Sequence, residues 1–194
     1  MSNIKLVHSG GNSVSLTTPD SNPAANRTVK FPDANGTLAL TNGITEFDSW
    51  YLTANKTSNG DLTSNLSRQD KLGSASPLGT GMSQSSGVFT FPSTGKWLVI
   101  VEALFVCNDN DNVTLDTNVT LNNSSYTKTH SAIDGNNGSG DKHGSAMTFC
   151  FLDVTDTSQV KVKFSASSIG SGSYVVAQQS YVETAFHFVR IGNT

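Results

Sequence analysis

The run from Lys96 to Cys107 constrains the fold of this chain more than any other part of the sequence. Between Trp97 and Cys107 the only charged residue is Glu102, and apolar positions do not alternate with polar ones. A helix is the competing interpretation of a run this long. Its β-branched residues, and the turn Pro92–Gly95 just before it, favour a strand. An antiparallel strand with one wet face would alternate, so both faces of this strand are predicted to be covered.

The rest of the chain supports an all-β fold. Further strand-like runs, separated by turns with Gly or Asn, span residues 47–53, 88–91, 113–121, 145–154, 160–164, 174–178 and 184–191. The chain contains only three Glu, and long surface helices normally need more residues of this kind. Short strands at regular spacing predict a two-sheet sandwich or jelly roll.

Charge is scarce and is not gathered in any part of the sequence. The net charge is −3, the pI is near 5.7 and no Lys/Arg-rich run occurs, which argues against nucleic acid as the main partner. No stretch approaches the roughly 20 apolar residues of a membrane-spanning helix, so membrane insertion is not expected. The first residues, Met1–Lys5, lack the apolar core of a signal peptide, and we expect a protein made in the cytoplasm.

The first 43 residues form a segment of a different kind. Short strand-like runs alternate there with Gly- and Asn-containing turns, and they span residues 4–7, 14–17, 28–31 and 37–40. Strands this short cannot bury a core alone. We therefore expect residues 1–43 to dock on another chain and residues 44–194 to form the main domain. The candidate docking residues are Val29, Phe31, Leu38 and Leu40.

The two cysteines, Cys107 and Cys150, both lie in apolar strand-like runs. Two buried free thiols are the simpler interpretation. A disulfide between adjacent strands is the alternative, and it would be unusual without secretion.

Two polar regions are candidates for metal binding. Asn108–Asn112 offers oxygen ligands for calcium, but it lacks the Gly and the distal Glu of a full calcium-binding loop, so a polar hairpin turn is the simpler explanation. His130, Asp134, Asp141 and His143 could bind a transition metal. Ordering the Gly- and Asn-rich loop between them would cost entropy, which makes an exposed loop the simpler explanation. We expect no cofactor.

Signatures of catalysis are missing from the sequence. No nucleophile elbow, paired Glu acid and base, phosphate-binding loop or zinc-type Cys spacing occurs. We therefore expect a protein that is not an enzyme. His187, in the last apolar run, is expected to be hydrogen-bonded within a sheet or at an interface.

Three segments resemble the jelly roll shared by tumour necrosis factor and the globular heads of complement-type proteins. Gly87–Trp97 is similar to that family's G-x-F-x-x-P-x-x-G-x-Y/W lead-in to its central strand. Ser145–Phe164 resembles a hairpin of the family with an Asp-containing turn, and Thr184–Ile191 resembles its closing strand. The resemblance runs from about residue 47 to the end and implies a jelly roll that forms homotrimers.

The N-terminal segment carries a second resemblance. Phe31–Ala39, with the sequence FPDANGTLA, is similar to a phrase common near the N-termini of bacteriophage fibre and virion proteins. Together the two resemblances imply a structural protein of a tailed-phage virion, such as a capsid decoration, a head fibre or a fibre component. Such a protein would attach to a capsid or tail protein through residues 1–43.

Two alternatives to the structural role stay open. One is a tail-fibre tip for host attachment, which would recognise a host surface glycan with loops such as 54–86 and 134–144. The other is a signalling ligand of the same fold, against which the phage-like N-terminus and the missing secretion signal count.

A threefold axis would supply cover for strands that are apolar on both faces. In the run 96–107, the uninterrupted apolar set is expected to face the sandwich core: Trp97, Val99, Val101, Ala103 and Phe105. The other set is expected to face the axis, because a charge is easier to keep near an interface than in a core: Leu98, Ile100, Glu102 and Leu104. From the closing strand, Phe186, Phe188 and Arg190 are expected to face the same axis, with Arg190 available to pair with Glu102.

Overall fold

The computed structural model describes residues 4–7, 10–11, 13–16, 44–71 and 77–194. The chain divides into two compact units, Met1–Leu40 and Thr41–Thr194, where the sequence suggested a boundary at residue 43. In the first unit, β1 (Ile4–Val7) pairs antiparallel with β2 (Ser13–Leu16). The candidate docking residues Val29, Phe31, Leu38 and Leu40 lie outside the described residues.

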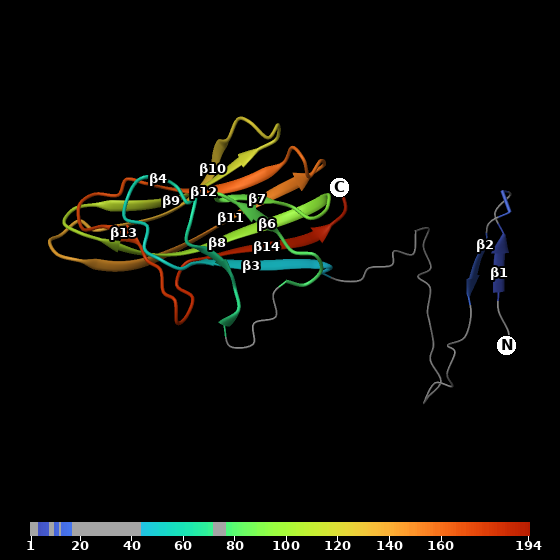
Figure 1. The fold of residues 1–194 in the computed structure, drawn as a ribbon, viewed down its shortest axis with the longest axis horizontal. Coiled ribbons are helices and arrows are strands. Elements are labelled where there is room, and N and C mark those ends of the chain that lie inside the picture. The colour runs from blue at the N-terminus through green and yellow to red at the C-terminus, as the bar shows by residue number, and fades with distance from the viewer. Residues whose placement is uncertain (1–3, 8–9, 12, 17–43, 72–76) are drawn as a thin grey trace, which may run out of the picture. The chain divides into compact units, whose positions relative to one another are not determined.

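The second unit contains a sheet with the strand order β11–β8–β14–β3–β5, to which β13 adds by pairing with β8 (Figure 1). All of its pairings are antiparallel. In that order the strands span Lys142–Val154, Gly95–Cys107, Ala185–Gly192, Glu46–Leu52 and Leu66–Arg68, with β13 at Tyr174–Val175. The central strand β8 is the long apolar run, so the strand interpretation of that run is confirmed.

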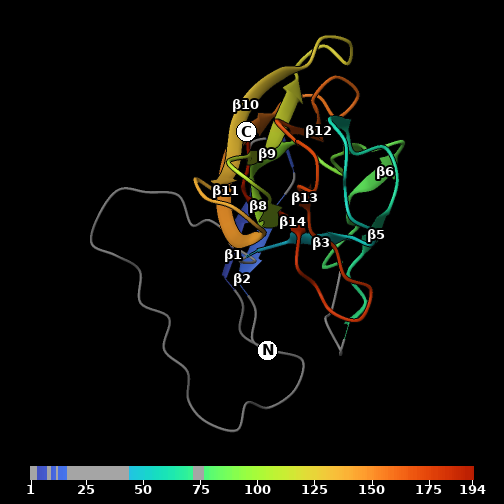
Figure 2. The same cartoon turned by 90° about the vertical axis from the view of Figure 1, so that its left-hand side faces the viewer.

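The other sheet has the order β10–β9–β12–β7–β6, with β4 paired to β12. In that order the strands span Thr127–Gly135, Asn112–Thr120, Lys161–Ser167, Val88–Thr90 and Ser83–Ser85, with β4 at Gly60–Asp61. Strands β10 and β11 lie at one edge of the two-layered sandwich, and β5 and β6 lie toward the opposite edge (Figure 2). No α-helix occurs among the described residues, and the predicted all-β jelly-roll fold is confirmed.

The core lies between the two sheets, and β8 supplies its centre. The five residues expected there, Trp97, Val99, Val101, Ala103 and Phe105, are at most 2% exposed. Phenylalanines from both sheets pack against one another. The ring centroids of Phe89 and Phe188 are 5.0 Å apart, and those of Phe164 and Phe186 are 4.2 Å apart. Each fully buried side chain of this size stabilises the fold by about 1.5–3 kcal/mol.

Two glycines explain the lead-in to β8. Gly87 and Gly95 have φ angles of 81° and 145°, in a region that residues with a Cβ rarely adopt. A Cβ on Gly87 would lie 1.9 Å from the Leu62 carbonyl oxygen, and one on Gly95 would lie 2.6 Å from that of Gly192. The two glycines of the G-x-F-x-x-P-x-x-G-x-W segment are therefore required both by backbone conformation and by close packing.

Strand β9 has buried polar side chains. Apolar and polar residues alternate along it, a pattern typical of a strand with one wet face, yet Asp116 and Thr120 on the polar side are 4% and 1% exposed. The strand lies between β10 and β12, and neighbouring side chains cover it. The Asp116 carboxylate accepts hydrogen bonds from the Ser131 and Ser167 hydroxyls at 2.6 and 2.9 Å. Hydrogen bonding from neighbouring strands therefore allows these polar side chains to be buried.

Cys107 and Cys150 are buried free thiols, as predicted. Burial raises the pKa of both thiols above the ordinary value. Since the thiolate is the reactive form, both should react with a disulfide reagent about a hundredfold more slowly in the native protein than after denaturation. A timed thiol titration with and without urea measures this. A native thiol that reacts as fast as free cysteine would contradict the burial of that side chain.

Candidate functional site

The face of the β11–β8–β14–β3–β5 sheet that points away from the core is strongly apolar. On β11 it presents Met147, Phe149 and Phe151, whose side chains are 64%, 61% and 61% exposed. We call this surface the outer apolar face and define it by Phe47, Leu98, Ile100, Leu104, Met147, Phe149, Phe151 and Val189. Contiguous exposed apolar surface of this kind marks a site of interaction with another molecule.

Strand register makes the outer apolar face continuous. Residues that pair directly across neighbouring strands point to the same side of the sheet. One such row crosses four strands through Phe151, Leu98, Val189 and Phe47. The next row crosses the same strands through Phe149, Ile100, His187 and Ser49. In the third row Met147 pairs with Glu102.

Leu98, Ile100, Glu102 and Leu104 lie on this face, away from the core side of β8, as the sequence predicted. Their role at a trimer interface stays a prediction. The assignment of Phe186 and Phe188 to the same face is wrong, because both are 0% exposed in the core. Phe186 pairs with Val101 and Phe188 with Val99, so all four side chains point inward.

The predicted pairing of Arg190 with Glu102 is also wrong. Arg190 pairs with Trp97 near the start of β8, several residues from Glu102. Its guanidinium donates hydrogen bonds to the Thr94 carbonyl oxygen at 2.9 Å and to Asn193 Oδ1 at 2.8 Å. Arg190 therefore links the C-terminal end of β14 to the turn before β8 by a hydrogen bond.

Glu102 instead faces His187, which lies within the outer apolar face. His187 Nε2 is 3.7 Å from Glu102 Oε2, and His187 Nδ1 is 2.9 Å from Ser49 Oγ. The Ser49 hydroxyl donates to Gln69 Oε1 at 2.5 Å. The prediction that His187 is hydrogen-bonded within a sheet is thus confirmed. Its side chain is 19% exposed, whereas that of Glu102 is 56% exposed.

Beside Glu102 the sheet surface is hollowed. The hollow has a volume of about 560 Å³, and its lining includes Glu102, Leu104, Ser145, Met147 and Glu183. Two carboxylates therefore lie at the margin of a largely apolar surface. Any molecule that covers this surface must remove water from them, which is costly unless a proton or a cation compensates.

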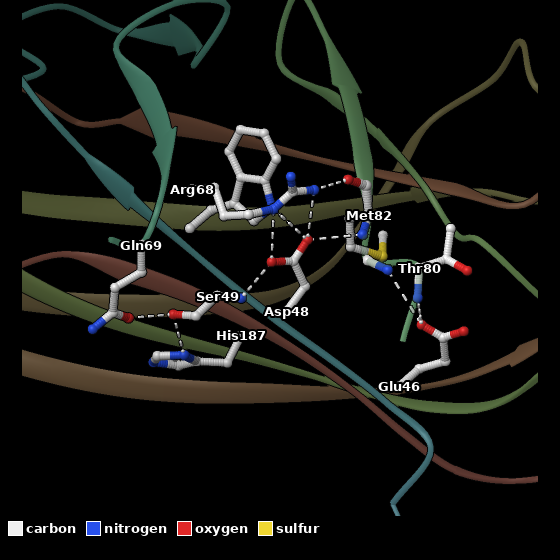
Figure 3. Close-up of polar contacts among 10 residues, drawn as sticks. Glu46, Asp48, Ser49, Arg68, Gln69, Thr80, Met82 and His187 are labelled. Atoms are coloured by element: carbon white, nitrogen blue, oxygen red, sulfur yellow. Dashed lines mark hydrogen bonds and ion pairs between the residues drawn. The ribbon is translucent and has the colours of Figure 1, made fainter. Parts of the chain in front are cut away.

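A polar network on the core side of β3 holds that strand in place (Figure 3). Asp48 is 1% exposed, and its carboxylate accepts hydrogen bonds from Arg68 Nε at 3.1 Å, Trp50 Nε1 at 2.9 Å and the Met82 N–H at 2.8 Å. Arg68 also donates to the Met82 carbonyl oxygen at 2.6 Å. Glu46 receives the Thr80 N–H at 2.9 Å. This network joins β3, β5 and the segment before β6, and so fixes the β3 edge of the outer apolar face.

The loop regions give no metal site among the described residues, where no cluster of three or more His, Cys, Asp or Glu side chains is placed to hold an ion. Asn108–Asn112 forms a turn, closed by a 3.0 Å hydrogen bond from the Asp111 N–H to the Asn108 carbonyl oxygen. His130 and His143 are exposed on β10 and β11. Asp141 accepts a hydrogen bond from Asn108 Nδ2 at 2.6 Å.

Asp134 and Asp111 contribute packing and hydrogen bonds within these loops. A Cβ on Gly144 would lie 1.6 Å from Asp134 Oδ2, so the glycine makes room for that carboxylate. Burial raises the pKa of Asp111, but hydrogen bonds from the Ser173 side chain and the Gly170 N–H outweigh it and hold the pKa below its usual value. Within the described ranges, no helix is long and apolar enough to cross a membrane.

Sequence reasoning missed the most exposed part of the outer apolar face. Met147, Phe149 and Phe151 alternate with Thr148 and Cys150 in a run that is apolar on both sides. Apolar residues on both sides of a strand had also predicted the second, outward face of the run 96–107. The same pattern in the run 145–154 could therefore have identified these residues. Phe47 and Val189 were missed because the strand order that brings them into the row is not visible in the sequence.

Comparisons with known proteins concern the fold. No protein-family model matches the sequence. No curated protein matches it either. The structure is similar to the crystal structure of murine APRIL at pH 5.0, with a TM-score of 0.56 and 9% identity over 75% of this chain and 98% of that one. It is also similar to Eiger TNF from S. frugiperda, with a TM-score of 0.54 and 13% identity over 77% of this chain and 95% of that one. The second unit therefore has the jelly-roll fold of tumour necrosis factor.

Proposed function

We propose that this protein is a non-enzymatic structural building block that assembles as a homotrimer through the outer apolar face. The observation that carries the proposal is the exposure of Met147, Phe149 and Phe151 on one continuous sheet face. Each is already about 40% covered, so complete burial would contribute about 1–2 kcal/mol per side chain. Repeated in every protomer, this gain favours association over leaving the face in water.

A second copy of the chain is the partner that fits this surface best. The rows that cross the face place one carboxylate, Glu102, among side chains that are mostly apolar, so the face does not repel a copy of itself strongly. Closed symmetry is the usual way in which identical chains bury such a surface. The resemblance to the tumour necrosis factor jelly roll supports three copies around an axis.

The location that we propose for the trimer is a tailed-phage virion, as a capsid decoration, a head fibre or a fibre component. The support is the likeness of Phe31–Ala39 to the N-terminal phrase of phage fibre and virion proteins. Residues 1–43 would then attach the trimer to a capsid or tail protein.

The mass of the purified full-length protein tests the assembly. Light scattering coupled to size exclusion should give three times the chain mass of 20.5 kDa. A monomer at all concentrations would reject the proposal.

Imaging of a virion with and without residues 1–43 of the protein then tests the location, because loss of the segment should abolish incorporation. Reproducible binding on a glycan array would favour the fibre-tip alternative.

A further inference from the structure

His187 and Glu102 form a pair whose electrostatic interaction becomes strong only when water is removed from around it. Both lie on the outer apolar face, next to Ile100 and Met147, and their facing atoms are 3.7 Å apart. In the free protomer water screens the exposed carboxylate of Glu102. In an assembly that covers the face, the same two groups interact in a medium of lower dielectric, where charge effects are larger.

Hydrogen bonding holds the ring of His187 in place on this face. The Ser49 hydroxyl donates to Gln69 Oε1 at 2.5 Å, and Ser49 Oγ lies 2.9 Å from His187 Nδ1. The other ring nitrogen, Nε2, is the one that lies 3.7 Å from the Glu102 carboxylate.

Protonation of the ring changes this interaction. Beside a neutral imidazole, burial of the Glu102 carboxylate is unfavourable once water is excluded. A protonated imidazole at 3.7 Å supplies a positive charge on the same protomer. Imidazole is the side-chain group whose charge ordinarily changes between about pH 5 and 8. Burial of the face should therefore be linked to proton uptake.

Among the residues that the structure describes, neighbouring strands place both uncharged and charged groups around the pair. Strand β3 contributes Ser49, and Phe47, whose ring stacks on the imidazole at 6.3 Å. Strand β11 contributes the uncharged Met147 and Phe149. Further along the face, Lys71 Nζ lies 5.3 Å above the Tyr51 ring. Glu183 lines the same hollow as Glu102 and adds a second carboxylate there.

We propose that His187 and Glu102 make self-association of this protein dependent on pH, with tighter association near pH 6 than near pH 8. The inference rests on the proposed assembly through the outer apolar face. The sign follows from proton uptake, because lowering the pH favours whichever state binds more protons.

The test is a dilution series of the full chain by sedimentation velocity at pH 6 and pH 8. The dissociation constant should be about tenfold or more lower at pH 6. His187→Asn keeps a donor near Ser49 but cannot be protonated, and it should abolish most of the difference. Glu102→Gln should tighten association at pH 8 and also flatten the pH dependence. His130→Asn changes an exposed histidine on β10 and should leave the difference unchanged.

The outcomes separate the two proposals. An assembly with the same dissociation constant at both pH values would overturn the proposed pH dependence and leave the proposed trimer intact. If the dissociation constants at pH 6 and pH 8 still differ in His187→Asn, other groups cause the difference. That result would also overturn the role proposed for His187. A full chain that is monomeric at both pH values would remove the assembly, and the pH dependence with it.

Discussion

Replacing Phe149 by Asp should convert the assembled protein to monomers without unfolding it. Phe149 is 61% exposed on β11, between Met147 and Phe151 on the outer apolar face, so the protomer fold does not depend on its ring. In the assembly the new carboxylate would be buried without a partner, at a cost of several kcal/mol per ion in each protomer. Light scattering should show the mass of a single chain, while circular dichroism and the urea midpoint stay close to those of the wild type.

Leu121→Asp is the matched control for this substitution. Leu121 is 70% exposed and lies beyond the end of β9, outside the outer apolar face. The same added charge, with a comparable loss of apolar surface, should leave the oligomer intact there. If Phe149→Asp remains a trimer, the interface lies on another surface. If both variants dissociate, added charge alone weakens the assembly, and the face assignment loses its support.

Replacing Arg68 by Met should lower the free energy of unfolding by about 3 kcal/mol. The substitution keeps an aliphatic stem against Trp50, over which the guanidinium now lies at 5.0 Å. It removes the guanidinium that pairs with the carboxylate of Asp48, which is 1% exposed. Removing one partner of a buried pair costs about 3–5 kcal/mol, and we take the lower end because the Arg68 side chain is 37% exposed.

Urea denaturation measures this effect, and Lys128→Met provides the control. Lys128 is 57% exposed and lies 3.6 Å from Asp116, whose carboxylate keeps two serine donors. An exposed pair of this kind contributes less than about 1 kcal/mol. Equal midpoints for the two variants would show that the Asp48 network does not hold β3 and β5 together. A large loss in Arg68→Met alone supports that role.

The Asp48 network and Phe149 lie on opposite sides of the same sheet. Asp48 and Arg68 hold β3 and β5 from the core side, while Phe149 presents apolar surface on the other side. If the network fails, the β3 edge that carries Phe47 moves, and association should weaken as a secondary effect. Association of Arg68→Met at low urea concentration would therefore be a useful additional measurement.

Sequence pattern alone was sufficient to predict the fold class and the core-facing side of β8. The β-branched run 96–107 and the alternation of later strands predicted two sheets, and the uninterrupted set from Trp97 to Phe105 identified the core side of β8. Glu102 marked the opposite side, because an unpaired charge is excluded from a core. Local pattern is sufficient in these cases, since side chains alternate strictly along a strand.

The side of the closing strand that faces the core follows from strand pairing and could not be predicted from the sequence. Phe186, Phe188 and Val189 make β14 apolar on both sides, so its sequence contains no information on orientation, and only the pairing of Phe188 with Val99 settles it. The partners His187 and Glu102, and likewise Asp48 and Arg68, are distant in sequence and meet through strand order alone. Such contacts depend on register and topology, which alternating hydrophobicity does not encode.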